Sequence, residues 1–263
     1  KQTYYEGFNA GGSKLAFDDP NYRLLQNMDP ATFYMSSYRG EHNVVSQFAQ
    51  ASYSLSDKYL LSGTVRRDGS SRFVNNVYSI FPSGSIGWRI SNESFMDNVS
   101  FINDLKLKAS YGLLGNNEVG GDYPGFSNFG TSVGTANYDI NGTGNSTVTG
   151  FEQTSTGNPN LRWETSAITN IGFDANIFNS ITLSLEWYSR KTTDMIYNVE
   201  LPLELGAVGR QPQNIGSMKN TGIDFSLAYA KRINRDFNFN VAVTGSTVKN
   251  TVLKLEANDN SFI

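Results

Sequence analysis

The chain of 263 residues is 38% hydrophobic, 17% charged and 13% aromatic, and its net charge of −3 excludes a protein that binds nucleic acid through clustered Lys and Arg. It contains no Cys, which excludes disulfides, thiolate metal sites and Cys nucleophiles, and no apolar run reaches the ~18 residues of a membrane-spanning helix. Two classes remain open: a soluble all-β protein and a transmembrane β-barrel.

Apolar and polar residues alternate along the chain with the two-residue period of a β-strand. The clearest run is 104–113, where apolar residues such as Leu105 and Leu107 alternate with polar residues such as Lys106 and Lys108. In chain order, the pattern predicts strands at 43–55, 59–66, 77–90, 104–113, 161–177, 180–191, 223–229 and 237–244. Most of these strands have the ~9–11 residues that cross a bilayer at a tilt.

The connections between the predicted strands alternate between short and long. Short turns lie at 56–58, 178–180 and 231–235, a medium one at 91–103, and long loops at about 67–76, 114–160 and 192–214. This asymmetry is typical of outer-membrane barrels, which have short periplasmic turns and long extracellular loops. We therefore expect an all-β, antiparallel, up-and-down transmembrane barrel segment with strands over 43–247. Residues 1–42 would form an extracellular loop region, and 248–263 would begin a further outer loop.

Aromatic residues near the predicted strand ends support this interpretation. Trp88, Trp163 and Trp187 lie near strand ends, and Tyr53 and Tyr59 flank the first short turn. Such positions are typical of the aromatic girdles at the two membrane–water interfaces. The alternative is that these rings pack in the core of a soluble sheet.

Five segments resemble, in the same order, the SusC/RagA-like TonB-dependent outer-membrane transporters of Bacteroidota. They are Asp57–Phe73, Phe81–Ser91, Leu105–Gly112, Gly157–Thr165 and Asn214–Gly222. The resemblance runs from about residue 43 to about residue 247. It implies a barrel of roughly 22 strands, whose wide lumen a plug domain closes. The chain would then be an internal piece of the C-terminal half of the barrel, without the plug domain or a signal peptide.

The resemblance also implies a function and partners. The full protein would import bulky nutrients, glycan oligomers or peptides, through the outer membrane. A SusD-like surface lipoprotein would cap the outer loops, and a TonB complex would act through the plug. The segment itself would contact outer-membrane lipid and form part of the barrel wall.

The long loop at 114–160 is the candidate region for contact with a ligand or the lipoprotein, because aromatic rings pack on sugar faces and loops often carry function. Its candidate residues are Tyr123, Phe126, Phe129, Tyr138 and Phe151. The alternative is a loop that packs only on itself. A second set would face the lumen or the plug: Lys106, Lys108, Arg162, Asp174, Glu186, Arg190 and Asp224.

The family-like signature residues favour a structural role. They are Arg66, Asp68, Gly69, Ser70, Ser71, Arg72 and Phe73 in one segment, and Asn158, Pro159, Trp163 and Glu164 in another. We interpret the first segment as a loop held by Asp68 caps and Arg–carboxylate pairs. The alternative is that its charges line the mouth of the lumen.

The sequence offers no convincing catalytic, metal or cofactor site. His42 is the only His, so neither a His metal site nor a His-dependent triad can form. Asp139 and Asn141 could ligate Ca²⁺, but too few oxygen donors accompany them. Glu152 and Glu164 are the only carboxylates considered as an acid/base pair for a glycan-cleaving enzyme, and nothing indicates that they converge. The main alternative function is a soluble or surface-attached all-β module for carbohydrate binding or adhesion.

Overall fold

The computed structural model describes residues 1–12, 28–131, 137–139, 141, 142, 144, 147–202, 204, 209–235 and 237–255. The long strands are β1 (Gln2–Gly11), β2 (Tyr34–Leu55), β3 (Tyr59–Ser70), β4 (Tyr78–Arg89), β5 (Ile102–Asn116), β10 (Glu164–Ile177), β11 (Ile181–Glu200), β12 (Arg210–Arg232), β13 (Asn238–Ser246) and β14 (Lys249–Leu255). Four short strands are β6 (Asn128–Gly130), β7 (Asn137–Asp139), β8 (Thr147–Thr149) and β9 (Glu152–Ser155). Single 3-10 turns are η3 (Pro30–Thr32), η4 (Ile90–Asn92) and η5 (Ser94–Met96). Within the described residues, no helix is long and apolar enough to cross a membrane.

The chain forms two compact units, Lys1–Val44 and Val45–Ile263. In the first unit, β1 pairs antiparallel with the beginning of β2, from Gln2 opposite Asn43 to Gly11 opposite Tyr34. The sequence predicted only a loop region over 1–42, and the structure gives a strand hairpin there instead. The two-residue period is weak in this hairpin because aromatic residues occupy adjacent positions, as at Tyr4 and Tyr5. The extracellular position of 1–42 stays a prediction.

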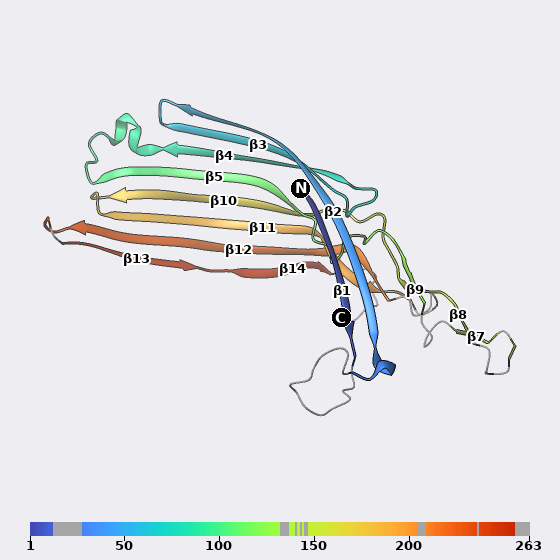
Figure 1. The fold of residues 1–263 in the computed structure, drawn as a ribbon. Coiled ribbons are helices and arrows are strands. Elements are labelled where there is room, and N and C mark those ends of the chain that lie inside the picture. Colours follow the sequence, from blue (N-terminus) through green and yellow to red (C-terminus); the bar gives the residue numbers. More distant parts are fainter. Residues whose placement is uncertain are drawn as a thin grey trace. The chain divides into compact units, whose positions relative to one another are not determined.

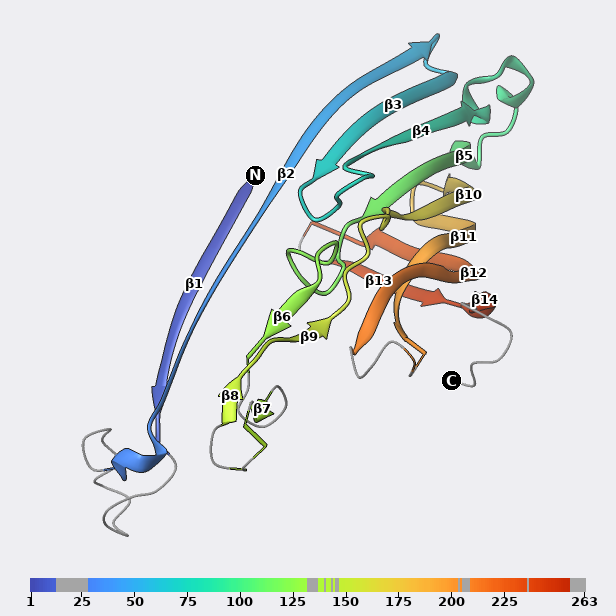
Figure 2. The same ribbon diagram turned by 90° about the vertical axis from the view of Figure 1, so that its right-hand side faces the viewer.

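In the second unit, the strands lie side by side in one curved sheet (Figures 1 and 2). The order is β2–β3–β4–β5–β10–β11–β12–β13, and β14 also pairs with β12. The pairs from β3 to β13 and the pair β12–β14 are antiparallel. In the described part of the chain the order ends at β13 and does not close on itself. This confirms the predicted all-β, antiparallel, open segment.

β14 is a correction to the loop expected at 248–263. Lys249–Leu255 forms a strand that pairs with β12, from Thr221 opposite Lys249 to Gly216 opposite Leu255. The sequence pattern missed this strand because Val252 and Leu253 are adjacent apolar residues and interrupt the two-residue period. The remaining positions, 256–263, lie outside the described residues.

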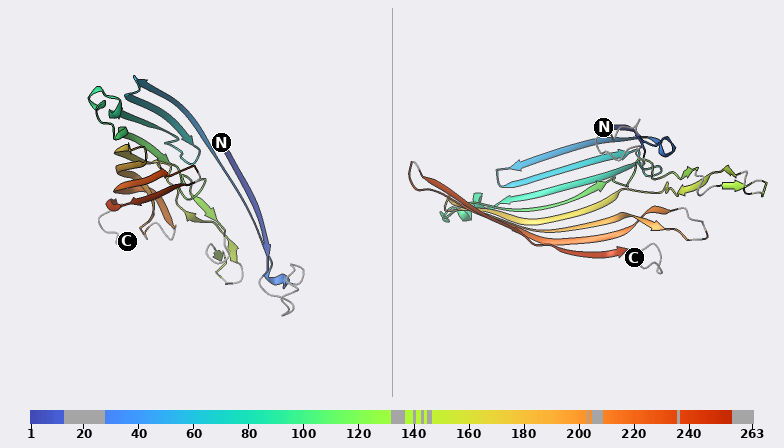
Figure 3. Two further views of the ribbon diagram at one scale, coloured as in Figure 1. Left: turned by 90° about the vertical axis from the view of Figure 1, so that its left-hand side faces the viewer. Right: turned by 60° about the horizontal axis from the view of Figure 1, so that its bottom comes forward.

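The strands also run further than predicted at the end that carries the long connections. β3 reaches Ser70, β11 reaches Glu200 and β12 begins at Arg210, so two of the long connections shorten to 71–77 and 201–209. The longest one, expected at 114–160, lies at 117–163 and keeps its length. The extra strand residues are largely polar, so they give no apolar alternation to read. Figure 3 shows β6 to β9, which belong to the longest connection, extending beyond the strand ends. There β6 pairs with β9, and β7 pairs with β8.

The opposite end of the sheet carries tight turns. Ser56 and Asp57 have φ of 54° and 53°, and Phe178 and Asn179 have φ of 55° and 53°. Two successive residues with positive φ form the turn whose twist matches that of paired strands. The predicted short turns at 56–58 and 178–180 are therefore present as hairpin turns. We call this the short-turn end.

The register places apolar and polar side chains on opposite faces of the sheet. One row across the strands, on the face that we call the apolar face, is Trp88, Leu107, Phe173, Leu185 and Phe225. The row next to it on the other face, which we call the polar face, is Gly87, Lys108, Gly172, Glu186 and Asp224. Most large side chains on the apolar face are exposed, for example Ile86 at 59% and Ile171 at 53%. This face therefore lacks a protein partner within its unit.

Candidate functional site

A network of ion pairs crosses three strands of the polar face. Lys106 and Lys108 on β5 each place Nζ 3.0 Å from a different carboxylate oxygen of Asp174 on β10. Lys108 also lies 3.4 Å from Oε2 of Glu186 on β11, and Asp174 accepts a hydrogen bond from Ser184 at 2.8 Å. The two lysine and two carboxylate side chains are about one-third exposed, and their two positive and two negative charges balance. We call Lys106, Lys108, Asp174 and Glu186 the charge network.

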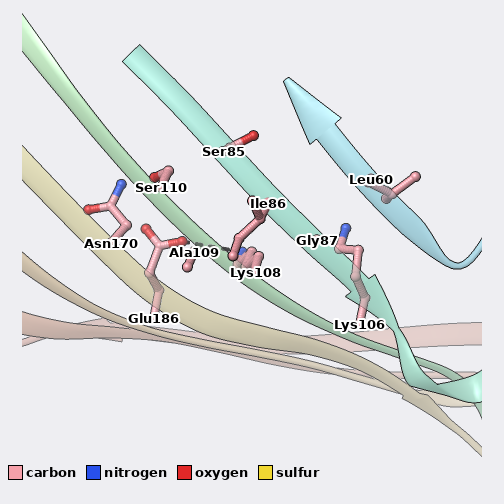
Figure 4. A pocket seen from close by; sticks show the side chains of 10 residues that line it. All are labelled: Leu60, Ser85, Ile86, Gly87, Lys106, Lys108, Ala109, Ser110, Asn170 and Glu186. Carbon is pink, nitrogen blue, oxygen red and sulfur yellow. Dashed lines mark ion pairs between the residues drawn. The ribbon is translucent and has the colours of Figure 1, made fainter. Parts of the chain in front are cut away.

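Gly172 on β10 allows the longest of these ion pairs, the one between Lys108 and Glu186. It lies between Lys108 and Glu186 in the register, and a Cβ there would overlap the backbone carbonyl of Leu185. Without a side chain in between, Lys108 reaches across β10 to Glu186, as the dashed line in Figure 4 marks. The network borders a hollow of about 260 Å³ whose other polar lining residues are Ser85, Ser110 and Asn170.

The register brings six of the seven residues predicted to face the lumen or the plug onto this one face: Lys106, Lys108, Asp174, Glu186, Arg190 and Asp224. Nε of Arg190 donates to Oγ of Ser166 at 3.2 Å, and Asp224 accepts from Ser246. The seventh, Arg162, precedes β10 and pairs with Asp194 at 2.7 Å instead. That the polar face looks onto a lumen stays a prediction.

A small buried core lies at the end of the sheet that carries the long connections. Its members are Phe73, Phe81, Val119, Leu161 and Trp163, all between 1% and 8% exposed. The Trp163 ring lies 5.3 Å from the Phe73 ring and 5.7 Å from the Phe81 ring, centroid to centroid. We call this cluster the loop-end core. It joins β4 to two of the long connections, although these segments are far apart in the sequence.

This core overturns one sequence interpretation. Trp163 was expected in an aromatic girdle at the membrane interface, but it is only 6% exposed and its indole nitrogen donates to the carbonyl of Val77 at 3.2 Å. β10 begins at Glu164, so Leu161 and Trp163 belong to the connection and not to the strand. Trp88 and Trp187, in contrast, are 37% and 43% exposed on the apolar face.

The signature segment 66–73 was expected to be a loop held by Asp68 caps and Arg–carboxylate pairs, but Arg66 to Ser70 belong to β3 and only the residues after Ser70 lie in a connection. The Arg–carboxylate pairs are present, and the structural role of the segment stays a prediction. Nε of Arg66 donates to both carboxylate oxygens of Asp68 at 2.8 Å. The Arg72 side chain is 10% exposed and pairs with Glu118 at 3.0 Å and with Asp122 at 3.4 Å. The remaining members are Gly69, under the Tyr78 ring, Ser70, which accepts from Asn117, and Ser71, which is exposed.

The second signature segment is tied to β12 by side-chain amides. Asn214 on β12 accepts from the backbone N–H of Arg162 at 3.0 Å and donates to the carbonyls of Arg162 at 2.8 Å and Asp194 at 2.7 Å. Nδ2 of Asn158 donates to the carbonyl of Pro212 at 2.9 Å. The carbonyl of Pro159 accepts from the N–H of Asn75 at 3.1 Å.

Glu164 and Asp194 complete this attachment. The Glu164 carboxylate accepts from the N–H of Ile196 at 2.7 Å and from Nδ2 of Asn116 at 2.8 Å. Asp194 has φ of 57° at a point where the register of β11 against β12 shifts. Sequence reasoning missed Asp194, Asp122 and Asn76, since each acts through a partner distant in the sequence. Nδ2 of Asn76 donates to the carbonyl of Leu161 at 3.1 Å. Asn214 lies in the segment Asn214–Gly222 that carries the family resemblance, and this was the one available signal.

The five aromatic candidates for ligand contact are all exposed, between 53% and 75%: Tyr123, Phe126, Phe129, Tyr138 and Phe151. Phe129 is in β6, while Tyr138 is in β7 of a separate two-stranded sheet, where its ring covers Gly150. The structure therefore leaves these rings accessible but divides them between different small sheets. Their role in ligand contact stays a prediction.

The carboxylates considered for calcium and catalysis have structural partners. Asp139 accepts from the backbone N–H groups of Asn141, at 3.3 Å, and of Gly144, so it closes a turn. The Glu164 carboxylate accepts hydrogen bonds from Ile196 and Asn116, and Glu152 is in β9. Among the described residues, no group of three or more His, Cys, Asp and Glu side chains could hold a metal ion.

A separate polar cluster holds the short-turn end together. Glu93, between η4 and η5, accepts from Lys58 at 3.0 Å, from Tyr59 at 2.8 Å and from the indole nitrogen of Trp88 at 3.1 Å. These hydrogen bonds hold the pKa of the Glu93 carboxyl below its usual value, and the hydrogen bond from Lys58 has the largest effect. Arg89 pairs with Asp57 at 2.8 Å beside this cluster.

Long antiparallel strands, tight turns at one end, long connections at the other, and opposed apolar and polar faces together define a wall segment of a transmembrane β-barrel. A family model described as "TonB dependent receptor-like, beta-barrel" matches residues 2–261. The chain belongs to this family. Its members similar to SusC and RagA are outer-membrane proteins, and the segment is accordingly part of an outer-membrane barrel.

Individual relatives agree with this assignment. The chain is 36% identical over 260 residues to TonB-dependent receptor P3 of Formosa agariphila, covering 98% of the chain and 25% of the relative. It is 32% identical over 228 residues to TonB-dependent receptor SusC of Bacteroides thetaiotaomicron, covering 86% of the chain and 22% of SusC. The RagAB peptide importer in its closed-closed state aligns with a TM-score of 0.81 and 30% identity, covering 100% of the chain and 28% of that structure. The chain thus spans about a quarter of the length of these relatives.

Proposed function

We propose that the protein imports bulky nutrients, glycan oligomers or peptides, across the outer membrane, driven by a TonB complex. The family match over residues 2–261 is the observation that carries this proposal. The segment supplies part of the barrel wall: its apolar face contacts lipid, and its polar face lines the interior. The charge network neutralises its own charges, so it presents a polar surface with little net charge to whatever occupies the lumen.

We also propose that the long connections form the outer surface where a SusD-like lipoprotein docks. The support is that the loop-end core and the Asn214 hydrogen bonds give 117–163 a fixed base, while its aromatic residues stay exposed. A rigid base with exposed aromatic residues suits recognition of a partner or a ligand.

An uptake experiment tests this function. Cells that carry the whole protein are grown on limiting oligosaccharide or peptide mixtures, with and without a protonophore, and depletion of each component is measured. We expect energy-dependent depletion of one class of oligomer, which is lost when the gene is deleted. Equal depletion in the deletion strain would contradict the proposal.

Affinity purification under mild detergent tests the proposed lipoprotein partner. Recovery of the transporter without a surface lipoprotein would contradict the docking proposal.

The soluble or surface-attached binding module is the weaker function. In a soluble module, the exposed side chains of Ile86, Ile171 and Leu107 would face water. A contiguous apolar patch of this kind is unfavourable in water and is rare on soluble monomeric proteins. A protein that remained folded and monodisperse in buffer without detergent would favour the module instead.

A further inference from the structure

The apolar face carries a groove near the short-turn end. The groove has a volume of about 490 Å³, and its floor is Ala109, the small residue between Ile86 and Ile171 in one row of the register. The neighbouring row adds Leu107 and, at the short-turn end, Trp88 opposite Tyr59. The groove therefore has branched aliphatic walls, a shallow floor and one aromatic end.

Beyond the opposite end of the groove, on the same face, stands Tyr111 of β5, which is 54% exposed and lies directly opposite Gly84. Two residues further along the same face, Gly63 lies directly opposite Gly84, and a Cβ at Gly63 would meet nothing within 4 Å. Strand residues two apart are ~7 Å distant along the strand. The gap without side chains therefore lies over β3 and β4, diagonally beside the groove, and leaves room there for an apolar occupant.

The aromatic end of the groove lies beside a pair of opposite charges. Tyr59 and Trp88 both donate hydrogen bonds to Glu93, and the same carboxylate pairs with Lys58 at 3.0 Å. Aromatic residues with one bonded polar end are typical of the membrane–water interface. A charge pair without net charge complements a head group that itself contains one phosphate and one ammonium.

We propose that this groove holds one acyl chain of a zwitterionic phospholipid, with its ammonium directed to Glu93 and its phosphate to Lys58. The groove is continuous with the lipid-facing surface of an outer-membrane protein, so the occupant is a membrane lipid. The proposal does not depend on what the protein imports. It adds a bound lipid to a wall that otherwise meets the membrane only through general apolar contact.

Two measurements on the whole protein test it. First, Ala109→Phe fills the groove, and Val243→Phe is the matched control, because Val243 lies on the same face, is 56% exposed and does not line the groove. Bound phospholipid per protein is counted by native mass spectrometry after detergent exchange. We expect the wild type and Val243→Phe to retain one phosphatidylethanolamine and Ala109→Phe to lose it. Equal retention in all three would overturn the proposal.

The second measurement uses the wild-type groove. Quenching of tryptophan fluorescence in the wild type is compared in detergent micelles doped with brominated phosphatidylethanolamine or brominated phosphatidylglycerol, and the signal of a Trp88→Phe variant is subtracted to isolate Trp88. We expect half-maximal quenching at a several-fold lower content of the zwitterionic lipid. Equal quenching by both lipids would overturn the head-group assignment. If Ala109→Phe alters the oligomeric state while lipid retention is unchanged, the groove is a protein interface and the proposal is wrong.

Discussion

The ring of Phe81 on β4 covers Gly115 on the neighbouring strand β5, in the space that a Cβ of residue 115 would occupy. Phe81 is only 4% exposed and packs edge-to-face against Trp163. The absence of one side chain on β5 thus lets the loop-end core lie directly on the sheet.

Gly115→Ala tests this relationship. The added methyl group must displace the Phe81 ring, and overpacking of this kind costs about 1–3 kcal/mol in the free energy of unfolding. Guanidinium unfolding of the detergent-solubilised protein measures the change. Gly63→Ala is the matched control, since its Cβ would meet nothing within 4 Å. Equal stability of the two variants would mean that Phe81 does not lie on Gly115.

Asn214→Ala is expected to loosen the connection 117–163 from β12. The substitution removes two donated hydrogen bonds and one accepted bond at Arg162 and Asp194. Buried polar groups that lose a partner cost about 1–3 kcal/mol each, and exposure to water reduces that cost here. Limited proteolysis should cleave 117–163 several-fold faster than in the wild type. Gln213→Ala, which removes only a bond to the neighbouring Gln211 side chain, should leave the cleavage rate nearly unchanged.

Leu107→Lys and Lys106→Leu test which face meets lipid. Leu107 is on the apolar face, 41% exposed and directly opposite Trp88, so a lysine there should cost more than the about 0–1 kcal/mol of the interface and at most the about 2–4 kcal/mol of the membrane midplane. Lys106→Leu should cost far less, because Asp174 retains Lys108 and Ser184 as partners. Heat-dependent mobility on gels reports folding of each variant in the membrane. If both variants fold equally well, the assignment of the faces is wrong.

Asp174→Asn should weaken the charge network more than Glu186→Gln. Asp174 pairs with two lysines, while Glu186 pairs with Lys108 alone, at a longer distance. Partly exposed pairs are worth about 0.2–1 kcal/mol each, so we expect a loss of about 1 kcal/mol at Asp174 and less at Glu186. The difference should shrink in high salt, because salt screens the pairs. A larger loss for Glu186→Gln would contradict the central place of Asp174.

The short-turn end should respond to acid through Glu93. Its pKa is lowered in the folded protein, so its contribution to stability is present above the usual carboxyl pKa and is lost as the pH falls through the folded value. Because Trp88 donates to this carboxylate, its fluorescence should change in the same pH range. A titration of the wild type minus that of Glu93→Gln isolates the effect. Identical titrations would show that Glu93 does not hold this turn.

Much of the sheet could be predicted from the sequence because its signals are local. Alternation such as Leu105, Lys106, Leu107, Lys108 fixes which side chains share a face, since successive strand residues point to opposite sides. The turns at 56–58 and 178–180 were also visible, because they are short and polar or flanked by clear strands. The strand at Lys249–Leu255 and the hairpin within 1–42 lacked this alternation and were missed.

The loop-end core could not be predicted, because its contacts are not periodic. Nδ2 of Asn76 bonds the carbonyl of Leu161, 85 residues away, and Trp163 bonds Val77 across a similar separation. Trp163 therefore looked like an interface residue and is a core residue. The partners of Arg72 were likewise undetermined, although a loop held by Arg–carboxylate pairs was expected.

The sequence by itself determined the family, the antiparallel strands and the opposition of an apolar and a polar face, since these depend on short motifs and on a two-residue period. Only the tertiary structure decided where side chains converge. In the structure, Lys106 and Lys108 each form a 3.0 Å ion pair with Asp174. The Phe81 ring packs against Gly115, and a groove lies above Ala109. The physical reason is that register between strands, and contacts between distant loops, are set by packing across the whole sheet and not by any one segment.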